Sequence, residues 1–396
     1  MRYKGKTTLA RSIGDEKGYS YLNFDDSNLL QAATANPSGF VAGLPERVIL
    51  DEIQRVPELF ASIKMSVDQD RTSGRFLLTG STNILTIPQL SDSLAGRMAI
   101  LQLHPLAQAE REEVNPIFIS RLFGGDFTTA ISSTDSLSGT DTRHDIVERV
   151  NIGGYPPAIM RPNAWRRIAW HQDYVQTLVQ RDARDISRIH GLDILPDLLQ
   201  IAAAETARQV RISEMASRLP RSRPTVDSYI TLLEQLFLIE QLPAWSSNRM
   251  KRLVKTPKLH IGDTGLACGL LGIDPVGLQN DPELFGQLLE TFVYQELRRH
   301  ASWEDEPTRF YHFRDRDRSP AEVDIILERV GNRIAGVEVK SSHRVSSSDF
   351  RHLQKLADKV GDRFSAGALL YTGNSLLSFG EKMFAVPITE LWGGRN

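Results

Sequence analysis

The pattern of apolar and polar positions divides the chain into segments of different character. Over residues 1–110, short apolar runs alternate with longer stretches of helical spacing. Three of the runs have the length and composition of strands, YSYLNFDD, RVILDE and GRFLLTGS. Strands that alternate with helical segments predict a parallel sheet covered by helices. We therefore expect an α/β domain at residues 1–110.

The remaining sequence predicts three further segments. Residues 111–195 have mainly helical spacing and are expected to form a linker or lid, with Trp165 and Trp170 in its core. Within it, residues 124–142 are rich in Gly, Ser and Thr and are expected to be flexible. Residues 196–250 contain two short helical patterns, and residues 251–396 return to helices and strands. The predicted fold class is therefore α/β and multidomain.

Composition narrows the possible environments and partners. The 396 residues suggest two to four domains, and the net charge of −2 means that nucleic acid would have to bind a local basic patch. A single cysteine, Cys268, excludes an internal disulfide framework and suits a reducing, cytoplasmic compartment. The sequence contains no run of about 18 apolar residues, so we do not expect a membrane span. The sequence has no C-x-x-C or H-E-x-x-H pair, so we do not expect zinc.

A nucleotide-binding pattern lies at the start of the chain. Gly5, Lys6, Thr7 and Thr8 match the end of the phosphate-binding loop G-x-x-x-x-G-K-[ST]. In such a loop the backbone N–H groups hold the phosphates, Lys6 would reach the β- and γ-phosphates, and Thr7 would bind magnesium.

Two later strand ends supply the rest of the predicted ATP site. The apolar run of residues 48–50 leads into Asp51, expected in the magnesium shell, and Glu52, expected to orient the attacking water. The next strand leads to Ser81, placed to sense the γ-phosphate. Arg97 is a candidate arginine finger, with an ordinary surface arginine as the alternative.

The first glycine of the loop pattern would precede Met1, together with the strand that normally holds the loop. We expect either that the start codon is placed too late or that this is a truncated copy. If the chain begins at Met1, nucleotide affinity should be weak.

Residues 211–242 have the spacing of a winged helix-turn-helix. The second of its helices would enter the DNA major groove, with Arg221, Arg223 and Thr225 near its N-terminus. A basic stretch without an acidic residue follows and would track a phosphate backbone: Arg249, Lys251, Arg252, Lys255 and Lys258. The alternatives are a helical pair used only for packing or protein contact, and a solvated basic loop.

The C-terminal segment contains a spaced group of acids and a lysine. Glu290 lies in a helical pattern, Asp324 enters the strand AEVDIILE, and Glu338 and Lys340 lie two apart in the next strand. Asp324 and Glu338 would hold one or two Mg²⁺ ions, and Lys340 would orient water or stabilise the phosphate. This is the layout of PD-(D/E)xK, restriction-endonuclease-like domains, with Gln354 as a further candidate. The same fold also serves binding without cleavage, and strand charges also occur as solvent-facing pairs.

The combination of sequence motifs resembles a known family. VILDEIQRVPELFASIK, GRFLLTGSTNIL and SLAGRMAILQLHPL resemble an AAA-type P-loop ATPase domain. Members pair this domain with a C-terminal domain called DUF4143, and GGYPPAI, RLVKTPKLHIGDTGLA, LLETFVYQEL, AEVDIILE and GVEVKSS fit that pairing. The resemblance implies that Lys6, Thr7, Asp51 and Glu52 form the ATP site, with Ser81 on the sensor strand and Arg97 as the arginine.

Three functional hypotheses follow. The first is an ATP- and Mg²⁺-dependent ATPase that directs a nuclease to nucleic acid, DNA rather than RNA. The second is an ATP-responsive module that recognises DNA or protein and cuts nothing. The third is a degenerate copy. If Arg97 acts in trans, the protein forms a homo-oligomer.

Overall fold

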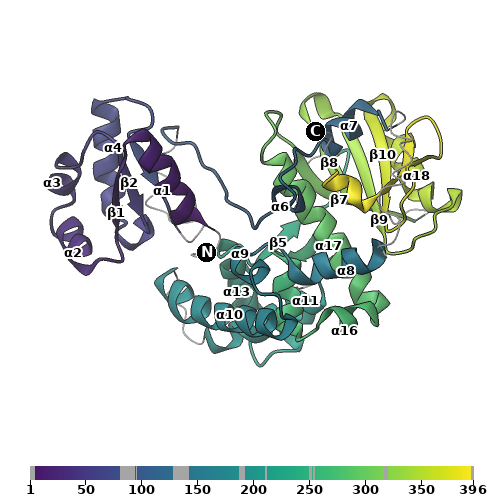
Figure 1. Cartoon of the computed structure of the whole chain (residues 1–396), viewed down its shortest axis with the longest axis horizontal. Coiled ribbons are helices and arrows are strands. Elements are labelled where there is room, and N and C mark those ends of the chain that lie inside the picture. The colour runs from purple at the N-terminus through teal and green to yellow at the C-terminus, as the bar shows by residue number, and fades with distance from the viewer. Residues whose placement is uncertain are drawn as a thin grey trace. The chain divides into compact units, whose positions relative to one another are not determined.

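A computed structural model describes residues 5–80, 94, 96–127, 142–186, 192–209, 212–248, 252, 255–315 and 320–393. The chain forms two compact units. The N-terminal unit comprises Met1–Leu103, Gln176–Asp193 and Tyr229–Phe237, and the C-terminal unit comprises His104–Val175, Ile194–Ser228 and Leu238–Asn396 (Figure 1). No helix among the described residues is long and apolar enough to cross a membrane.

The N-terminal unit contains the predicted parallel sheet. Its three strands, in the order β1-β2-β3, are β1 (Ser20–Asn23), β2 (Val48–Asp51) and β3 (Phe76–Leu78). Ile49 of β2 pairs with Tyr21 of β1 and Leu77 of β3. The helices of this unit include α1 (Lys6–Lys17), α2 (Ser27–Ala35), α3 (Pro37–Ala42) and α4 (Leu59–Gln69). All three predicted strands are therefore confirmed.

The central strand β2 is buried along its whole length. Its Val48 and Leu50 join a core with Phe24, Phe60 and Ile63, whereas Ile49 faces α1, where a Cβ on Gly14 would come within 2.5 Å of the Ile49 side chain. An uninterrupted apolar run fits a parallel strand covered on both faces. This packing fixes the position of the residue that follows, Asp51.

The C-terminal unit begins with helices: α6 (Gln108–Arg111), α7 (Phe118–Gly124), α8 (Thr142–Ile152), α9 (Pro156–Ile159) and α10 (Ala164–Ile186), of which α10 extends past Val175. The prediction that Trp165 belongs to the core is wrong, because its exposed fraction is 65%. Trp165 lies on the first turn of α10, whereas the buried stripe of that helix starts at Ile168 and continues through His171 and Tyr174. Trp170 is half-buried and stacks on Tyr174.

A helix–strand–helix–helix–strand–strand segment follows α10. Its elements are α11 (Leu195–Ala204), β4 (Arg208–Gln209), α12 (Ile212–Ser217), α13 (Arg223–Gln235), β5 (Ile239–Leu242) and β6 (Lys258–Ile261). The three strands form an antiparallel sheet in the order β4-β6-β5, so the last strand is the central one. Both helices of the predicted helix pair are present, and their apolar positions Met215, Ala216, Val226 and Leu233 are buried.

The rest of the unit is a six-stranded mixed sheet with the order β11-β12-β10-β9-β8-β7. Helices α15 (Thr264–Leu271), α16 (Pro275–Gln279) and α17 (Pro282–Ala301) precede it. The strands are β7 (Arg309–Asp315), β8 (Ala321–Glu328), β9 (Ile334–Lys340), β10 (Phe364–Tyr371), β11 (Leu377–Ser378) and β12 (Met383–Pro387). Strands β7, β8 and β9 are antiparallel, whereas β9, β10 and β12 run parallel.

Helix α18 (Arg351–Val360) connects β9 to β10 and packs on the sheet beside them (Figure 1). Gly336 of β9 permits the close approach, since a Cβ at this position would lie 2.7 Å from a Leu353 methyl group and 2.9 Å from one of Leu356. Leu353 and Leu356 belong to a core that also contains Val323, Ile326 and other residues of the sheet.

A buried turn joins the helices before α10 to α15 and α17. The Asp263 carboxylate is fully buried and accepts hydrogen bonds from the backbone N–H of Leu266 at 3.1 Å and of Gly154 at 2.7 Å. It also pairs with Arg299 of α17 at 3.4 Å. Asp263 is therefore the N-cap of α15.

Substitution of Gly265 by Ala should destabilise the C-terminal unit, because its Cβ would lie 2.3 Å from the Ile152 carbonyl oxygen. Backbone atoms cannot move aside as a side chain can, so we expect a loss of about 1–3 kcal/mol or more in the free energy of unfolding. Denaturant unfolding followed by tryptophan fluorescence measures this loss. Gly124→Ala is the matched control, since a Cβ there meets nothing within 4 Å and should leave stability unchanged or slightly raised.

Candidate functional site

The residues expected at the ATP site lie together in the N-terminal unit. Gly5 is the N-cap of α1, with a φ of 78°, and Lys6 and Thr7 start the helix. The Thr7 hydroxyl donates to Asp51 Oδ2 at 2.9 Å, and the Lys6 ammonium donates to the Gly80 carbonyl oxygen beyond β3. The structure therefore brings the loop residues to the carboxyl end of β2.

Asp51 is the centre of this group. Its residue is 3% exposed, and besides Thr7 it accepts hydrogen bonds from Tyr21 at 2.6 Å and from the Thr79 hydroxyl. Burial, and then the hydrogen bond to Asp51, raise the pKa of Tyr21 to about 12, so the phenol remains a proton donor at neutral pH. Donors from α1, β1 and the end of β3 thus hold one carboxylate.

Glu52 follows in a conformation that is uncommon for a residue with a side chain. Its φ is 57° and ψ 41°, in the left-handed region, and its side chain accepts a hydrogen bond from Gln54. Non-glycine residues in this region cost of order 1–3 kcal/mol and cluster at functional sites. The conformation turns the chain at the end of β2 and buries Glu52 to 5% exposure.

Of the two remaining candidates of the ATP site, only Arg97 lies among the described residues, and its ion-pair partner is outside this group. The Arg97 guanidinium forms an ion pair with Asp68, with Nε 2.6 Å from Oδ1 and Nη2 3.1 Å from Oδ2. Ser81 lies outside the described residues.

The residues at β2 fit a magnesium nucleotide. Mg²⁺ prefers hard oxygen ligands, and the Thr7 hydroxyl and Asp51 carboxylate already lie within hydrogen-bonding distance of each other. The helix N-terminus and Lys6 supply positive charge for phosphate.

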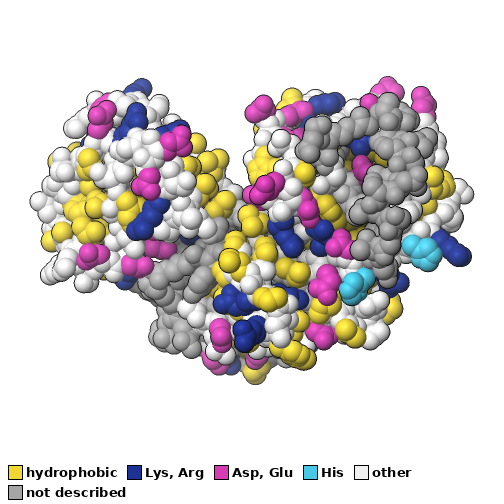
Figure 2. Space-filling view, viewed as in Figure 1, with side chains coloured by type: hydrophobic (Ala, Val, Ile, Leu, Met, Phe, Trp, Pro, Cys, Tyr) yellow, Lys and Arg dark blue, Asp and Glu magenta, His cyan; other side chains and the backbone are white. Residues whose placement is uncertain are grey.

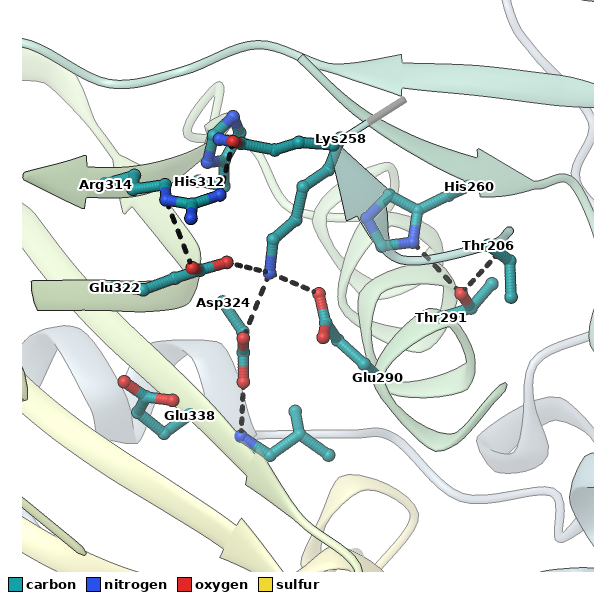
Figure 3. A network of polar contacts seen from close by, with 12 residues as sticks. Thr206, Lys258, His260, Glu290, Thr291, His312, Arg314, Glu322, Asp324 and Glu338 are labelled. Carbon is teal, nitrogen blue, oxygen red and sulfur yellow. Dashed lines mark hydrogen bonds and ion pairs between the residues drawn. The ribbon is translucent and has the colours of Figure 1, made fainter. Parts of the chain in front are cut away.

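A second group of charged residues lies in the C-terminal unit, around Lys258 of β6 (Figure 3). The Lys258 ammonium is 2.9 Å from Glu290 Oε1 of α17, 3.1 Å from Asp324 Oδ1 and 3.2 Å from Glu322 Oε1, both of β8. The Lys258 residue is 2% exposed. Burial alone would lower the pKa of Lys258, but the three carboxylates outweigh it and raise that pKa well above its usual value.

Burial and the neighbouring charges shift the pKa values of the acids near Lys258 in different directions. Burial, and then the charge of Asp324, raise the pKa of Glu290 to about 8 against the lowering effect of Lys258. Burial and the neighbouring Asp324 raise the pKa of Glu338 well above its usual value. The pKa of Asp324 is lowered despite burial, because Lys258 and the Val339 N–H, at 3.1 Å, stabilise its charge.

The predicted nuclease residues are only partly assembled. Glu338 lies beside Asp324 in Figure 3, and its buried Oε1 is 3.6 Å from His352 Nδ1 of α18 and has no hydrogen-bond partner among the described residues. Lys340 forms its ion pair with Asp349, and Gln354 donates to Asp358 at 3.3 Å. Among the residues that the structure describes, no group of three or more His, Cys, Asp or Glu is arranged to hold a metal ion.

Comparison with known proteins agrees with these two regions. Residues 1–112 match the family model described as an AAA domain, and residues 285–391 match a domain of unknown function, DUF4143. The chain joins an AAA domain to a DUF4143 domain. Residues 143–277 between them match a second domain of unknown function, DUF8612. The pairing expected from the sequence motifs is therefore confirmed.

Two mycobacterial proteins are similar over almost the whole chain. They are uncharacterized protein Mb2031c of Mycobacterium bovis and uncharacterized protein Rv2008c of Mycobacterium tuberculosis, each 27% identical over 393 residues. The alignment covers 98% of this chain and 79% of each relative.

The residues expected to contact nucleic acid fall into two groups. Arg221 and Arg223 are exposed beside the start of α13, where Thr225 lies 2.8 Å from the Ser222 hydroxyl. In the basic stretch, Arg252 instead forms a two-pronged ion pair with Glu328, at 2.6 and 3.1 Å. Lys255 is exposed and its ammonium is 3.5 Å from the Arg314 carbonyl, whereas Arg249 and Lys251 lie outside the described residues.

No large basic surface is visible. On the face drawn in Figure 2, basic and acidic side chains of the described residues are interspersed. This distribution agrees with the net charge of −2 and leaves the start of α13 as the basic candidate with exposed arginines.

Sequence reasoning missed two residues that the structure places in these groups: Tyr21 and Lys258. Tyr21 reaches Asp51 because β1 pairs in parallel with β2, the strand that ends at Asp51. Lys258 was expected in an exposed basic loop, and that expectation is wrong because the residue is buried among acids.

Acid should weaken the fold partly through His312, which lies beside Lys258. Burial, and then the charge of Lys258, lower the pKa of His312 from its usual 6.5 to about 3. Between these values the unfolded chain binds the proton and the folded chain does not, so stability falls as the pH falls.

His312→Gln keeps a donor for the Thr256 carbonyl, which Nε2 of His312 contacts at 3.1 Å, but cannot take up the proton. Its free energy of unfolding should therefore fall less steeply than that of the wild type, by about 1.4 kcal/mol per pH unit between about pH 4 and pH 6. Denaturant titrations at several pH values measure both slopes. Equal slopes would mean that His312 is protonated in the folded protein.

Proposed function

We propose that this protein binds and hydrolyses ATP in its AAA domain and uses a winged helix formed by residues 195–261 to contact DNA. The observation that carries the first part is the hydrogen bond between Thr7 and Asp51 at 2.9 Å, with Lys6 at the same end of the sheet. These are the residue types and positions that hold a magnesium nucleotide in P-loop ATPases.

In this proposal each side chain of the ATP site has one task. Lys6 and the N-terminal N–H groups of α1 neutralise phosphate oxygens, and Thr7 and Asp51 are the ligands that would hold Mg²⁺. When bound, the ion withdraws charge from the phosphate oxygens. Tyr21 and Thr79 fix the Asp51 carboxylate, and Glu52 orients water at the end of β2.

The DNA-binding part rests on the order and register of elements in the DUF8612 segment. A helix, a short strand, two helices and two strands, with the last strand central in the sheet, is the arrangement of a winged helix-turn-helix. In this arrangement α13 is the helix that enters the major groove. Its N-terminal end carries the exposed Arg221 and Arg223 with Thr225, which are suited to phosphate and base contacts.

A metal-dependent nuclease is a second candidate for the DUF4143 domain. Its favouring observation is the succession α17, β7, β8, β9, α18, β10, with Asp324 on β8 and Glu338 on β9, which matches the layout expected of restriction-endonuclease-like domains. Cleavage of single- or double-stranded DNA that needs Mg²⁺ and is lost in Asp324→Asn would establish this activity.

ATP hydrolysis should depend on the residues at the start of α1 and the end of β2. Lys6→Ala should abolish ATP binding, and Asp51→Asn should lower kcat by on the order of 10² or more, because the metal ligand loses its charge. Calorimetric titration with ATP and Mg²⁺ and a phosphate-release assay test both variants.

Lys17→Ala is the matched control, because Lys17 is the exposed last residue of the same helix α1. This variant should bind and hydrolyse ATP like the wild type. If Lys6→Ala hydrolyses as fast as Lys17→Ala, the ATP-site assignment is wrong.

Duplex DNA binding should weaken in Arg223→Ala. Since a phosphate contact releases counterions, the dependence of log Kd on log salt should become shallower by about 1. Fluorescence anisotropy with a labelled duplex at several salt concentrations gives both quantities. Arg309→Ala removes an exposed arginine on β7 and should change neither, and equal losses in the two variants would indicate non-specific attraction.

A further inference from the structure

The inference concerns the acids that the nuclease hypothesis assigns to a metal. A divalent-cation site needs carboxylate oxygens with lone pairs directed to a space that the ion and its water can enter. Glu290 and Asp324, from α17 and β8, meet this requirement in residue type. Their facing oxygens, however, are already 2.9 and 3.1 Å from the Lys258 ammonium.

The ammonium donates hydrogen bonds to Glu290 and Asp324 and forms an ion pair with Glu322. An ammonium has three N–H donors, and Lys258 has three carboxylate partners, with Glu322 at 3.2 Å as the third. Figure 3 shows the lysine side chain reaching from β6 into the space between these acids. The second oxygen of Asp324 is also occupied, because it accepts from the Val339 N–H.

Two cationic side chains already face these acids. Lys258 contacts Glu290, Asp324 and Glu322, and Glu322 has a second cationic neighbour, Arg314, at 3.6 Å. Entry of a divalent ion between the carboxylates would require displacement of the buried Lys258 ammonium.

The backbone of Lys258 is held on both sides by neighbouring strands, which fixes the position of its side chain. Lys258 pairs with Gln209 of β4 and Leu242 of β5, so it lies on the central strand of the three-stranded sheet. Two residues further on β6, His260 Nδ1 is 3.1 Å from the Thr291 hydroxyl of α17, next to Glu290. Strand β6 is thus held on α17 at two successive inward positions.

Lys340, the lysine of the sequence motif, is not the cation that contacts these carboxylates. Among the described residues it forms its ion pair with Asp349, so its ammonium does not neutralise Glu338 or Asp324. The cation that the carboxylates contact therefore comes from the DUF8612 segment, whereas Glu290, Glu322 and Asp324 come from the DUF4143 domain.

We propose that Lys258 is a resident cation that takes the place of the divalent metal, so that the acids of the DUF4143 domain fasten the DUF8612 segment to it and do not bind Mg²⁺. The inference does not rest on the proposed function, since neither nucleotide nor DNA enters it. It makes the opposite prediction to the nuclease candidate, which requires a divalent cation at these acids.

Titration of the full chain with Mn²⁺ tests the proposal. The probe is Mn²⁺ alone, without nucleotide, and the Asp51→Asn chain is used so that the Asp51 carboxylate of the AAA domain cannot bind the probe. Electron paramagnetic resonance of free Mn²⁺ should show no site at millimolar concentrations. A site that is present in this chain and lost on adding Glu290→Gln would overturn the proposal.

A second experiment looks for a variant that gains Mn²⁺ binding. Lys258→Met keeps the apolar stem and removes the ammonium, so in the same Asp51→Asn chain the Tm should fall by several degrees without metal. Millimolar Mn²⁺ should restore part of the Tm, and Glu290→Gln should abolish that recovery. Lys382→Met, at an exposed lysine of the same domain, should change neither the Tm nor Mn²⁺ binding.

The two arms are independent of each other and of the proposed function. If Lys258→Met fails to fold, the titration of the chain with Lys258 intact still decides the question. ATP hydrolysis and DNA binding are measured by other assays, so failure of those activities would leave the Mn²⁺ result unaffected.

Discussion

The ammonium of Lys258, enclosed by three carboxylates, is the interaction on which the arrangement of the C-terminal unit depends. It connects the central strand of one sheet to α17 and to β8 of another. Removing one partner from a buried ion pair typically costs about 3–5 kcal/mol, because the remaining charge stays buried without compensation. The group therefore specifies one relative placement of these elements, even if an apolar core of equal volume would be as stable.

Helix α17 carries a second set of buried polar contacts one to three turns further along. Glu296 accepts from the backbone N–H of Gln108 at 2.8 Å and pairs with Arg299 at 2.7 Å, and Arg299 reaches the Leu106 carbonyl at 3.0 Å. A helix buried on most sides normally has an apolar sequence. Four of the buried polar residues of α17 each hydrogen-bond to a neighbouring element: Thr291, Gln295, Glu296 and Arg299.

The sequence was most informative where function requires residues close together along the chain. The strand before Asp51 and the loop at Lys6 and Thr7 follow local rules, and the structure joins them as expected. The ion pairs of the basic residues at 249–258 were harder to predict, because a local run of basic residues usually lies on a solvated surface. Lys258 has partners 32 and 66 residues away, and Arg252 has one 76 residues away. Pairings of that separation depend on the whole fold and leave no periodic signal.

The three hydrogen bonds on Asp51 have a consequence for how the N-terminal unit responds to a ligand. A carboxylate offers about four lone-pair positions, and donors from α1, β1 and the end of β3 occupy three of them. A ligand that takes more than one position must therefore displace one of these donors. Ligand binding at Asp51 is then thermodynamically linked to the attachment of a helix or strand, so this single carboxylate couples the occupancy of the site to the local order of the sheet edge.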